Sequence, residues 1–170
     1  MLNIKYELVA EKKAKPDWDN LGFGKHFTDH MFIMDYDAGQ GWHDARIVPY
    51  QNLSLDPACM VFHYAQEMFE GLKAYRTPDG EIQLFRPDQN IDRMNNTNER
   101  LCIPQLDKQD VLDALKAIVK TEEDWVPAKE YLLSPKTWIS SRPGTRPIGK
   151  YRHSLNPMRR IGHSSTTSPA

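Results

Sequence analysis

The order of sequence patterns along this chain predicts an α+β fold, with helices on one side of a mostly antiparallel sheet. Short apolar or alternating segments come first and two segments of helical periodicity follow, an order typical of this class rather than of repeating β-α units. The length of 170 residues fits one domain. We expect a polar N-terminal arm (1–20), a folded domain (21–130) and a basic tail (131–170).

Two pairs of strands are predicted before the helices. The apolar segments 30–36 and 46–50 are separated by a glycine-containing loop and form an early antiparallel pair. Segments 71–76 and 81–85 alternate around the turn 77–80, whose sequence is Thr-Pro-Asp-Gly. Proline presets one turn dihedral and glycine accepts a positive φ, so this turn predicts a hairpin.

Two helices are predicted after the hairpin. The first begins at Pro87, which suits the first helical position, and it has only a thin apolar stripe. Asp107 is the predicted N-cap of the second helix. The apolar residues of that helix recur at the spacing of one buried face: Val111, Leu112, Leu115, Ile118 and Val119.

The charge distribution changes sharply near residue 130. Residues 1–130 carry 15 Lys+Arg and all 23 Asp+Glu, whereas residues 131–170 carry 7 Lys+Arg and no acid. The second segment also contains 11 Ser/Thr and 5 Pro. This composition is typical of disorder, so we expect an irregular C-terminal tail.

Several classes of protein are excluded by composition. No apolar run approaches the roughly 18 to 20 residues of a membrane span, and the N-terminus has no hydrophobic signal region and carries Glu7 and Glu11. We therefore expect a cytoplasmic protein with no membrane partner. Cys59 and Cys102 lie far apart without a metal-ligand spacing, so no metal site or disulfide scaffold is predicted. A lone histidine such as His30 is expected to be a hydrogen-bonded structural residue.

Three arginines, Arg86, Arg93 and Arg100, are spaced by seven residues and fall along one face of the first predicted helix. A guanidinium is a permanently charged fork that matches phosphate or carboxylate, so an anion site is one interpretation. The other interpretation is that these arginines are solvated or pair with acids of the same helix.

The segment 63–71 concentrates aromatic and acidic residues ahead of a glycine that could end a helical turn. Tyr64 and Phe69 could line an apolar pocket, with Glu67 or Glu70 as a base or an orienting acceptor. The alternative is that the aromatics belong to the core and the acids are solvated.

Four collinear segments carry a resemblance to a known family. They are FGKHFTDHM (23–31), PYQNLSL (49–55), HYAQEMFEGLKAY (63–75), and LFRP with NIDRM (84–87 and 90–94). In this order and spacing, the chain resembles the branched-chain amino acid aminotransferases from about Lys15 to Pro127.

The resemblance implies the D-amino-acid-aminotransferase-like fold and pyridoxal 5'-phosphate as cofactor. The chain would supply the small N-terminal domain, with a larger C-terminal domain beyond it, in enzymes that are usually homodimers. Such enzymes exchange the amino group of leucine, isoleucine or valine with 2-oxoglutarate. By resemblance, Arg93 holds the cofactor phosphate, and Phe27, Tyr64 and Phe69 shape the pocket for the branched side chain. The other two arginines of the row match no ligand position.

The resemblance ends after Pro127, where the family continues with a Ser-Leu-Tyr-Ile-Arg-Pro strand that differs from this sequence. The lysine that forms the Schiff base with the cofactor belongs to the family's C-terminal domain, and neither Lys25 nor Lys73 matches it. The sequence therefore predicts no catalytic residue in this chain and no turnover by the chain alone. The coincident change in composition favours a shifted reading frame or a mispredicted gene end after residue 130.

Two alternatives to an enzyme remain from the sequence. The chain could be a non-catalytic module that pairs with a full-length aminotransferase through the family's dimer surface, since an isolated small domain should expose an apolar patch around its pocket aromatics. The cationic tail could instead bind nucleic acid. That second alternative is disfavoured because the tail has no RGG repeats and few aromatics beyond Trp138 and Tyr151.

Overall fold

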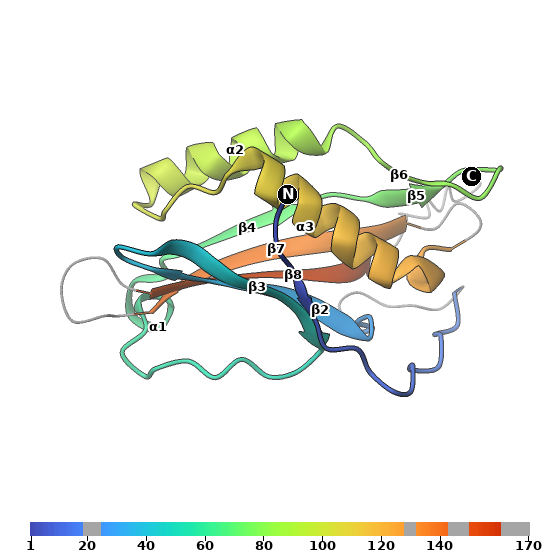
Figure 1. The fold of residues 1–170 in the computed structure, drawn as a ribbon, viewed down its shortest axis with the longest axis horizontal. Coiled ribbons are helices and arrows are strands. Elements are labelled where there is room, and N and C mark those ends of the chain that lie inside the picture. The colour runs from blue at the N-terminus through green and yellow to red at the C-terminus, as the bar shows by residue number, and fades with distance from the viewer. Residues whose placement is uncertain (19–24, 128–131, 143–149, 161–170) are drawn as a thin grey trace, which may run out of the picture.

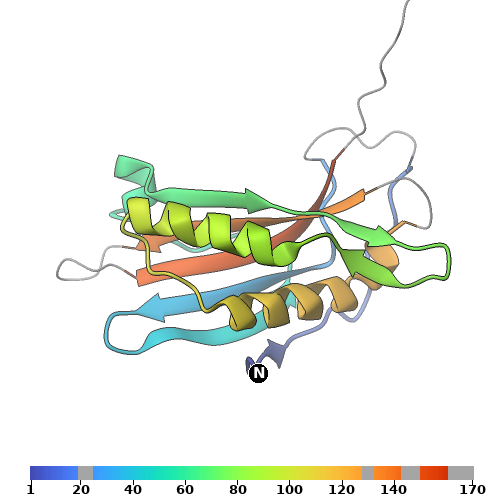
Figure 2. The ribbon, with the colours of Figure 1, turned by 90° about the horizontal axis from the view of Figure 1, so that it is seen from above.

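The computed structural model describes residues 1–18, 25–127, 132–142 and 150–160. Their strands form one eight-stranded sheet, and the two long helices lie on the same face of it (Figures 1 and 2). The predicted α+β class, with a mostly antiparallel sheet and helices on one side, is confirmed.

The elements follow the predicted order of strands before helices, with two further strands at the end. In chain order they are β1 (Lys5–Tyr6), β2 (His30–Asp37), β3 (Gly41–Pro49), α1 (Met60–Tyr64), β4 (Glu67–Gly71), β5 (Ala74–Arg76), β6 (Ile82–Leu84), α2 (Pro87–Arg100), α3 (Lys108–Thr121), the 3-10 turn η1 (Glu123–Trp125), β7 (Leu132–Arg142) and β8 (Lys150–Arg160). The strand order is β1-β3-β2-β8-β7-β5-β6, and β4 also pairs with β7. Each pairing is antiparallel except that of β1 with β3.

Both predicted strand pairs are present. β2 pairs with β3 in a register that places Phe32 opposite Ile47. β5 pairs with β6 across the predicted turn, where the Thr77 N–H donates to the Glu81 carbonyl at 2.8 Å and Gly80 adopts φ +92°. A side chain at Gly80 would be strained in this left-handed conformation, so the turn needs a glycine there.

The prediction that Gly71 ends a helical turn is wrong. Helix α1 ends earlier, at Ala65, which is itself left-handed with φ +47°. The chain then enters β4, in which Met68 and Glu70 are buried while Glu67 and Phe69 are exposed. This alternation is the period of a strand with one covered face.

Both long helices begin where the sequence predicts. Pro87 occupies the start of α2, and the Asp107 side chain accepts hydrogen bonds from the backbone N–H groups of Gln109 and Asp110 at the start of α3. Such a cap satisfies donors that have no partner within the helix. The face of α3 that packs on the sheet is buried as its periodicity predicts, with the buried residues Val111, Ala114, Leu115, Ile118 and Val119.

The main core lies between the sheet and helices α2 and α3. Phe32, Ile47 and Ile118 are each 0% exposed in it. Full burial of each such side chain contributes about 1.5 to 3 kcal/mol. A smaller cluster of Met31, Ile33 and Val48 lies on the opposite face, and Figure 1 shows the segment between β3 and α1 passing beneath the sheet on that side.

Residues 132–142 and 150–160 differ from the expected irregular tail, because their backbone forms β7 and β8 in the middle of the sheet. The composition has no strand periodicity, but the edges of β2 and β4 offer rows of backbone donors and acceptors, and these pair with β8 and β7. Positions 161–170 of the predicted tail lie outside the described residues. That the tail is non-native stays a prediction.

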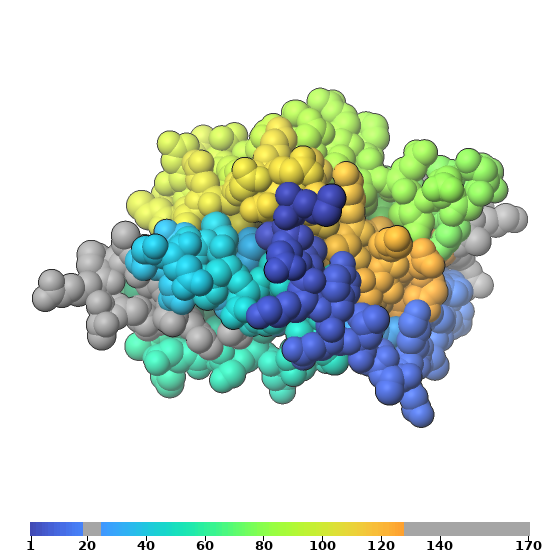
Figure 3. All heavy atoms as spheres, in the orientation of Figure 1, coloured from blue at the N-terminus to red at the C-terminus, as the bar shows by residue number. Residues whose placement is uncertain are grey.

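The N-terminal arm is bound to the domain. β1 pairs with β3, and the Leu2 N–H donates to the Asp113 carboxylate on α3 at 3.0 Å. In the space-filling view this arm lies across the front of the molecule against α3 and β3 (Figure 3). The polar composition predicted an arm, and the structure adds that its backbone is fixed by hydrogen bonds.

A buried carboxylate joins the end of α3 to the start of β2. Glu122 is 1% exposed and accepts hydrogen bonds from the N–H groups of Asp29 and His30, at 3.2 and 3.0 Å, and from the His30 ring Nδ1. The Val9 N–H donates to Nε2 of His30 at 2.9 Å, so Nδ1 is the ring nitrogen that donates to Glu122. Burial raises the pKa of Glu122, and the hydrogen bonds from His30 and Asp29 oppose that shift.

Asp29 binds the arm and η1 at the same place. Its carboxylate accepts a hydrogen bond from the Trp125 indole N–H at 2.8 Å and another from the Lys13 backbone N–H at 2.8 Å. The Lys15 ammonium lies 3.8 Å from the same carboxylate and 4.2 Å from the Trp125 ring centre. The arm, β2 and the end of α3 therefore share one buried polar cluster.

We expect Glu122→Ala to destabilise the fold by about 3 kcal/mol or more, because it leaves two buried backbone N–H groups and a buried imidazole N–H without an acceptor. Urea unfolding followed by circular dichroism measures the change. Glu122→Gln keeps one acceptor oxygen and should lie between the alanine variant and wild type. Glu123→Ala, at the exposed neighbouring position, serves as the control. Equal stability of Glu122→Ala and Glu123→Ala would contradict the role given to Glu122.

Candidate anion site and aromatic wall

Arg93 is held by a carboxylate of the neighbouring strand. It lies on α2, and its guanidinium donates from Nε to one oxygen of Glu70 at 2.8 Å and from Nη2 to the other at 2.5 Å. The Glu70 side chain is 8% exposed, whereas that of Arg93 is 67% exposed. A paired, two-bond contact of this kind fixes the plane of the guanidinium.

Glu70 is itself surrounded by donors. Its carboxylate also accepts hydrogen bonds from the Asn90 amide at 3.1 Å and from the Gly71 N–H at 2.9 Å. Burial by itself would raise the pKa of Glu70, but the hydrogen bonds from Arg93, Asn90 and Gly71 outweigh it and hold the pKa below its usual value. The same contact raises the pKa of Arg93. The pair is therefore ionised over the range in which proteins normally work.

The donor set of Arg93 fits a phosphate. A guanidinium has five N–H donors, and Glu70 uses Nε and one hydrogen of Nη2, which leaves the outer edge of the fork with three donors. Because the side chain is mostly exposed, this edge can meet a ligand from outside the domain. A phosphate such as that of pyridoxal 5'-phosphate would bind there through charge-assisted hydrogen bonds.

The three aromatic residues of the predicted pocket lie in two places. Tyr64 ends α1 and Phe69 lies in β4, with 74% and 57% of their surfaces exposed. Phe27 lies just before β2 and stacks on Tyr50, with ring centres 4.8 Å apart and ring planes 9° apart. The Lys13 ammonium of the arm lies 5.0 Å from the centre of the Tyr50 ring.

The predicted phosphate ligand and the exposed aromatics belong to opposite faces of β4. Glu70, and with it Arg93, lies on the face covered by α2, whereas Phe69 alternates to the other face. The domain therefore presents an exposed guanidinium edge on one side of β4 and exposed Phe69 on the other, and the described residues do not close a pocket around both. The alternation of β4 separates residues that one short sequence segment brings together.

The pairing of Arg93 differs from the interpretation in which these arginines pair with acids of their own helix, and it leaves the anion-site interpretation open. Arg93 pairs with Glu70, which lies 23 positions earlier on another element, and not with an acid of its own helix. Arg86 is the left-handed N-cap of α2 and Arg100 is its last residue. Of the roles left open for Glu70, the geometry supports that of orienting acceptor. Glu67, by contrast, lies on the exposed face of β4.

Other kinds of site are not supported in the described part of the chain. Those residues contain no group of three or more His, Cys, Asp or Glu that could hold a metal ion. They also contain no helix long and apolar enough to cross a membrane. Cys59 is buried and Cys102 is exposed.

The fold of the chain is similar to that of solved fold IV transaminases. It matches CpuTA1, a fold IV-transaminase from Curtobacterium pusillum, over 74% of this chain and 42% of that one, with a TM-score of 0.51 and 11% identity. It matches a branched-chain amino acid aminotransferase from Thermobaculum terrenum over 77% of this chain and 39% of that one, with a TM-score of 0.56 and 11% identity. At these identities the likeness concerns the fold.

The sequence narrows the class to one family. The chain is 56% identical over 127 residues to branched-chain-amino-acid aminotransferase 2 of Bacillus subtilis and 52% identical over 127 residues to a probable branched-chain-amino-acid aminotransferase of Staphylococcus epidermidis. Each match covers 75% of this chain and 35% of the relative, so the chain spans about a third of the relatives' length. No family model matches the chain. The predicted resemblance is confirmed, because the matched part of the chain is similar in sequence to branched-chain amino acid aminotransferases.

Two of the matching structures name a cofactor that is bound to the matching protein. One matching structure is the pyridoxal-phosphate form of the Thermobaculum terrenum aminotransferase, with a TM-score of 0.53 and 13% identity. Another branched-chain amino acid aminotransferase is complexed with N-(5'-phosphopyridoxyl)-L-glutamate, and it matches with a TM-score of 0.52 and 16% identity. Pyridoxal phosphate is therefore the cofactor of such relatives.

We expect Glu70→Gln to lower the free energy of unfolding by about 1 to 3 kcal/mol at neutral pH, because the charge-assisted bonds to Arg93 are lost. In the folded chain the pKa of Glu70 lies below its usual 4.5, so the contribution of the carboxylate is present above that pH and is lost as the pH falls through the lower folded value. Urea unfolding at a series of pH values should therefore show wild type approaching the variant in acid. Glu67→Gln, on the exposed face of β4, is the control, and a pH-independent difference for Glu70→Gln would contradict the prediction.

Proposed function

We propose that this chain is the small domain of a branched-chain amino acid aminotransferase and that its part in the reaction is to hold the cofactor phosphate and one wall of the substrate pocket. The observation that carries the proposal is Arg93, which is fixed by Glu70 and presents its free donor edge outward. The sequence match to aminotransferases over 127 residues supports it.

In this proposal Arg93 neutralises the phosphate, and Phe27, Tyr64 and Phe69 line the side of the pocket that receives leucine, isoleucine or valine. An aromatic wall suits such substrates because they differ by single methylenes, each worth about 0.8 kcal/mol when buried. The bound cofactor would supply the electron sink for amino-group transfer. Glu70 keeps the guanidinium oriented, and Asn90 keeps Glu70 in place.

We propose that the Schiff-base lysine lies outside the part of the chain that matches the aminotransferases. Lys25 and Lys73 lie in matched segments but not at the catalytic position. Because the lysine serves both as Schiff-base partner and as proton carrier, we propose that the polypeptide of 170 residues does not catalyse transamination by itself.

A second candidate function is a non-catalytic module that pairs with an intact aminotransferase chain. The observation in its favour is the set of exposed aromatics: Phe62, Tyr64 and Phe69 are 61%, 74% and 57% exposed. Exposed apolar groups of this size mark surfaces that associate. In the intact family a homodimer surface would supply the partner.

Arg93→Ala should weaken the binding of pyridoxal 5'-phosphate by about tenfold or more, because a charge-assisted phosphate contact is lost. Quenching of tryptophan fluorescence on titration of the full chain measures the affinity. Pyridoxal without the phosphate is the matched ligand control, and Arg100→Ala, at the end of the same helix, is the matched variant. Equal affinity for the two ligands in wild type would exclude Arg93 as a phosphate ligand.

The purified chain, supplied with leucine, 2-oxoglutarate and pyridoxal phosphate, is expected to form no glutamate above the rate without protein. An intact branched-chain aminotransferase assayed in parallel provides the positive control. Sustained turnover by the 170-residue polypeptide would show that a lysine within it completes the site, against the proposal.

A further inference from the structure

The strand β1 forms one rim of the sheet, and no described segment lies beyond it. It comes first in the strand order, and among the described residues it pairs with β3 alone. Figure 2 shows it outside β3, and in the space-filling view the arm lies uncovered at the front of the molecule (Figure 3). The free edge of a strand carries backbone donors and acceptors that can pair with another strand.

The backbone at Tyr6 points away from β3. The next residue, Glu7, donates its N–H to the Ile47 carbonyl at 2.9 Å, and Ile47 is the register partner of Tyr6. Successive residues of a strand turn their N–H and C=O groups alternately to its two sides. The outward groups are therefore those of Tyr6 and of its neighbours two positions away, Ile4 and Leu8. No hydrogen bond among the described residues reaches the backbone of these three positions.

The outward edge of β1 has defined ends. The Leu2 N–H also points outward, but it donates to the Asp113 carboxylate of α3 at 3.0 Å. At the other end, Val9 donates its N–H to Nε2 of the buried His30 at 2.9 Å. The backbone is thus held on both sides of residues 4–8, which we call the open edge. A segment that is already extended and held in place loses little entropy when it pairs.

The side chains of the open edge form a self-complementary pattern, which reads Ile-Lys-Tyr-Glu-Leu. In an antiparallel pair of copies with Tyr6 opposite Tyr6, Lys5 of one copy faces Glu7 of the other. Ile4 faces Leu8 in the same arrangement. A parallel pair in register would instead place lysine against lysine and glutamate against glutamate, which is unfavourable. The charges therefore select one orientation and one register.

These side chains are accessible. Tyr6 and Leu8 are 54% and 60% exposed, and the Lys5 side chain is 69% exposed. Lys5 lies 2.9 Å from Asp44, but an ammonium has three donors and can bind a second carboxylate. Tyr6 and Leu8 also border a hollow of about 450 Å³ whose far wall includes Ala117 of α3. Apolar side chains of a second copy would cover this hollow.

We infer that the open edge is a contact surface for a second copy of this chain, which pairs antiparallel with the first through β1. The two Tyr6 residues exchange both backbone hydrogen bonds at the two-fold axis, and Ile4 and Leu8 form the flanking pairs. Lys5 and Glu7 form ion pairs at the intervening positions, where opposite side chains come closest. The contact uses the same residues of both copies, so it closes at two copies.

This surface goes beyond the proposed function, because it uses no residue assigned to the cofactor phosphate or to the substrate wall. It is also separate from the exposed aromatics of the second candidate function. One pair of short strands is smaller than a stable interface, which buries about 1,200 to 2,000 Å². The expected dimer is therefore weak and depends on protein concentration.

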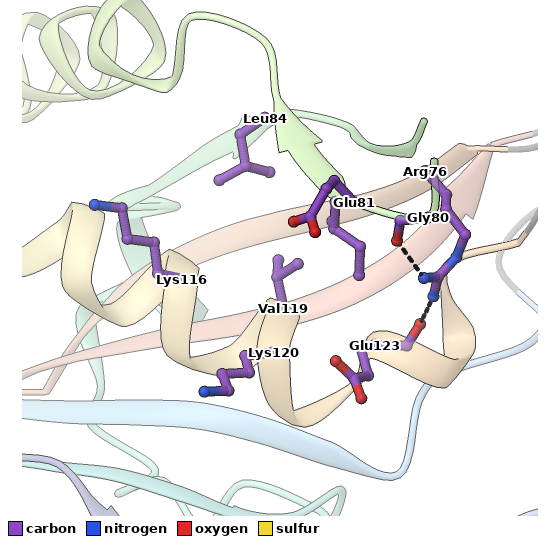
Figure 4. A pocket seen from close by; sticks show the side chains of 9 residues that line it. Arg76, Gly80, Glu81, Leu84, Lys116, Val119, Lys120 and Glu123 are labelled. Carbon is purple, nitrogen blue, oxygen red and sulfur yellow. Dashed lines mark hydrogen bonds between the residues drawn. The ribbon is translucent and has the colours of Figure 1, made fainter. Parts of the chain in front are cut away.

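The opposite rim of the sheet supplies a control position. There the β5–β6 hairpin ends the sheet, and the Arg76 guanidinium donates to the carbonyl oxygens of Gly80 at 2.9 Å and Glu123 at 2.6 Å (Figure 4). These bonds fix the hairpin turn to the end of α3. Glu81 follows the turn and is exposed. Glu81→Lys therefore changes the net charge as Glu7→Lys does, but far from β1.

Sedimentation velocity of the full chain at rising concentration tests the inference. Wild type should shift from monomer toward dimer. Lys5→Glu and Glu7→Lys should each dimerise about tenfold more weakly or worse, because acids then face acids in the first variant and bases face bases in the second. Glu81→Lys should dimerise as wild type does.

An equimolar mixture of the Lys5→Glu and Glu7→Lys chains separates a loss of pairing from a loss of folding. In the mixture each acid again faces a base, so a dimer of the two variants should form with about the affinity of wild type. A single chain that carries both substitutions exchanges the two charges and should also dimerise.

Amide hydrogen exchange locates the contact. The Tyr6 N–H, which faces away from β3, should exchange about tenfold more slowly at high protein concentration than at low concentration, whereas the Glu7 N–H should not change. A monomer at all concentrations up to about 1 mM would overturn the inference. So would a dimer that neither charge reversal weakens, or a mixture of the two variants that forms no dimer.

Discussion

The carboxylate of Glu122 is the constraint on which the arrangement of the domain depends. It lies at the end of α3 and is almost fully buried, and its hydrogen bonds come from two backbone N–H groups at the start of β2 and from the His30 imidazole. A buried charge of this kind is costly unless each of its acceptor sites is used. The contact therefore determines where β2 begins relative to the helix layer, and through Val9 and Lys13 it determines where the arm crosses.

The ion pair between Arg93 and Glu70 repeats this principle at the surface. There the Glu70 side chain is buried and that of Arg93 is exposed, so the buried carboxylate fixes the position of a guanidinium that faces outward. An arginine without such support would sample many rotamers, and holding a phosphate would require it to lose that freedom on binding. In this domain that freedom is lost during folding, which is how a rigid scaffold prepares a side chain for a ligand.

The fold was largely predictable from local patterns, and the site only from family resemblance. The Thr77–Gly80 turn, the Asp107 cap and the periodic face of α3 each act within a few residues, so the sequence alone indicates them. The partner of Arg93 was not predictable by spacing, because Glu70 lies on a different element and meets it only after the sheet and α2 pack. For the same reason the sequence indicated a structural role for His30 but did not identify Glu122 as its partner, because the two residues are 92 positions apart. Pairing to the edges of neighbouring strands likewise overrode the composition of residues 132–142 and 150–160.

The contact of Lys13 with the Tyr50 ring, which also stacks on Phe27, makes the arm a hidden part of the aromatic surface. Lys13 also donates from its backbone N–H to the Asp29 carboxylate and from its side chain to the Thr28 carbonyl, so it holds the segment that carries Phe27 at two points and contacts the stacked Tyr50 ring at a third. In the proposed function, the arm would therefore affect the substrate pocket without touching the substrate, because it helps to position the Phe27 ring. Two related domains with identical pocket aromatics but different N-terminal arms would present those rings at different angles, and comparing pocket residues alone would miss the difference.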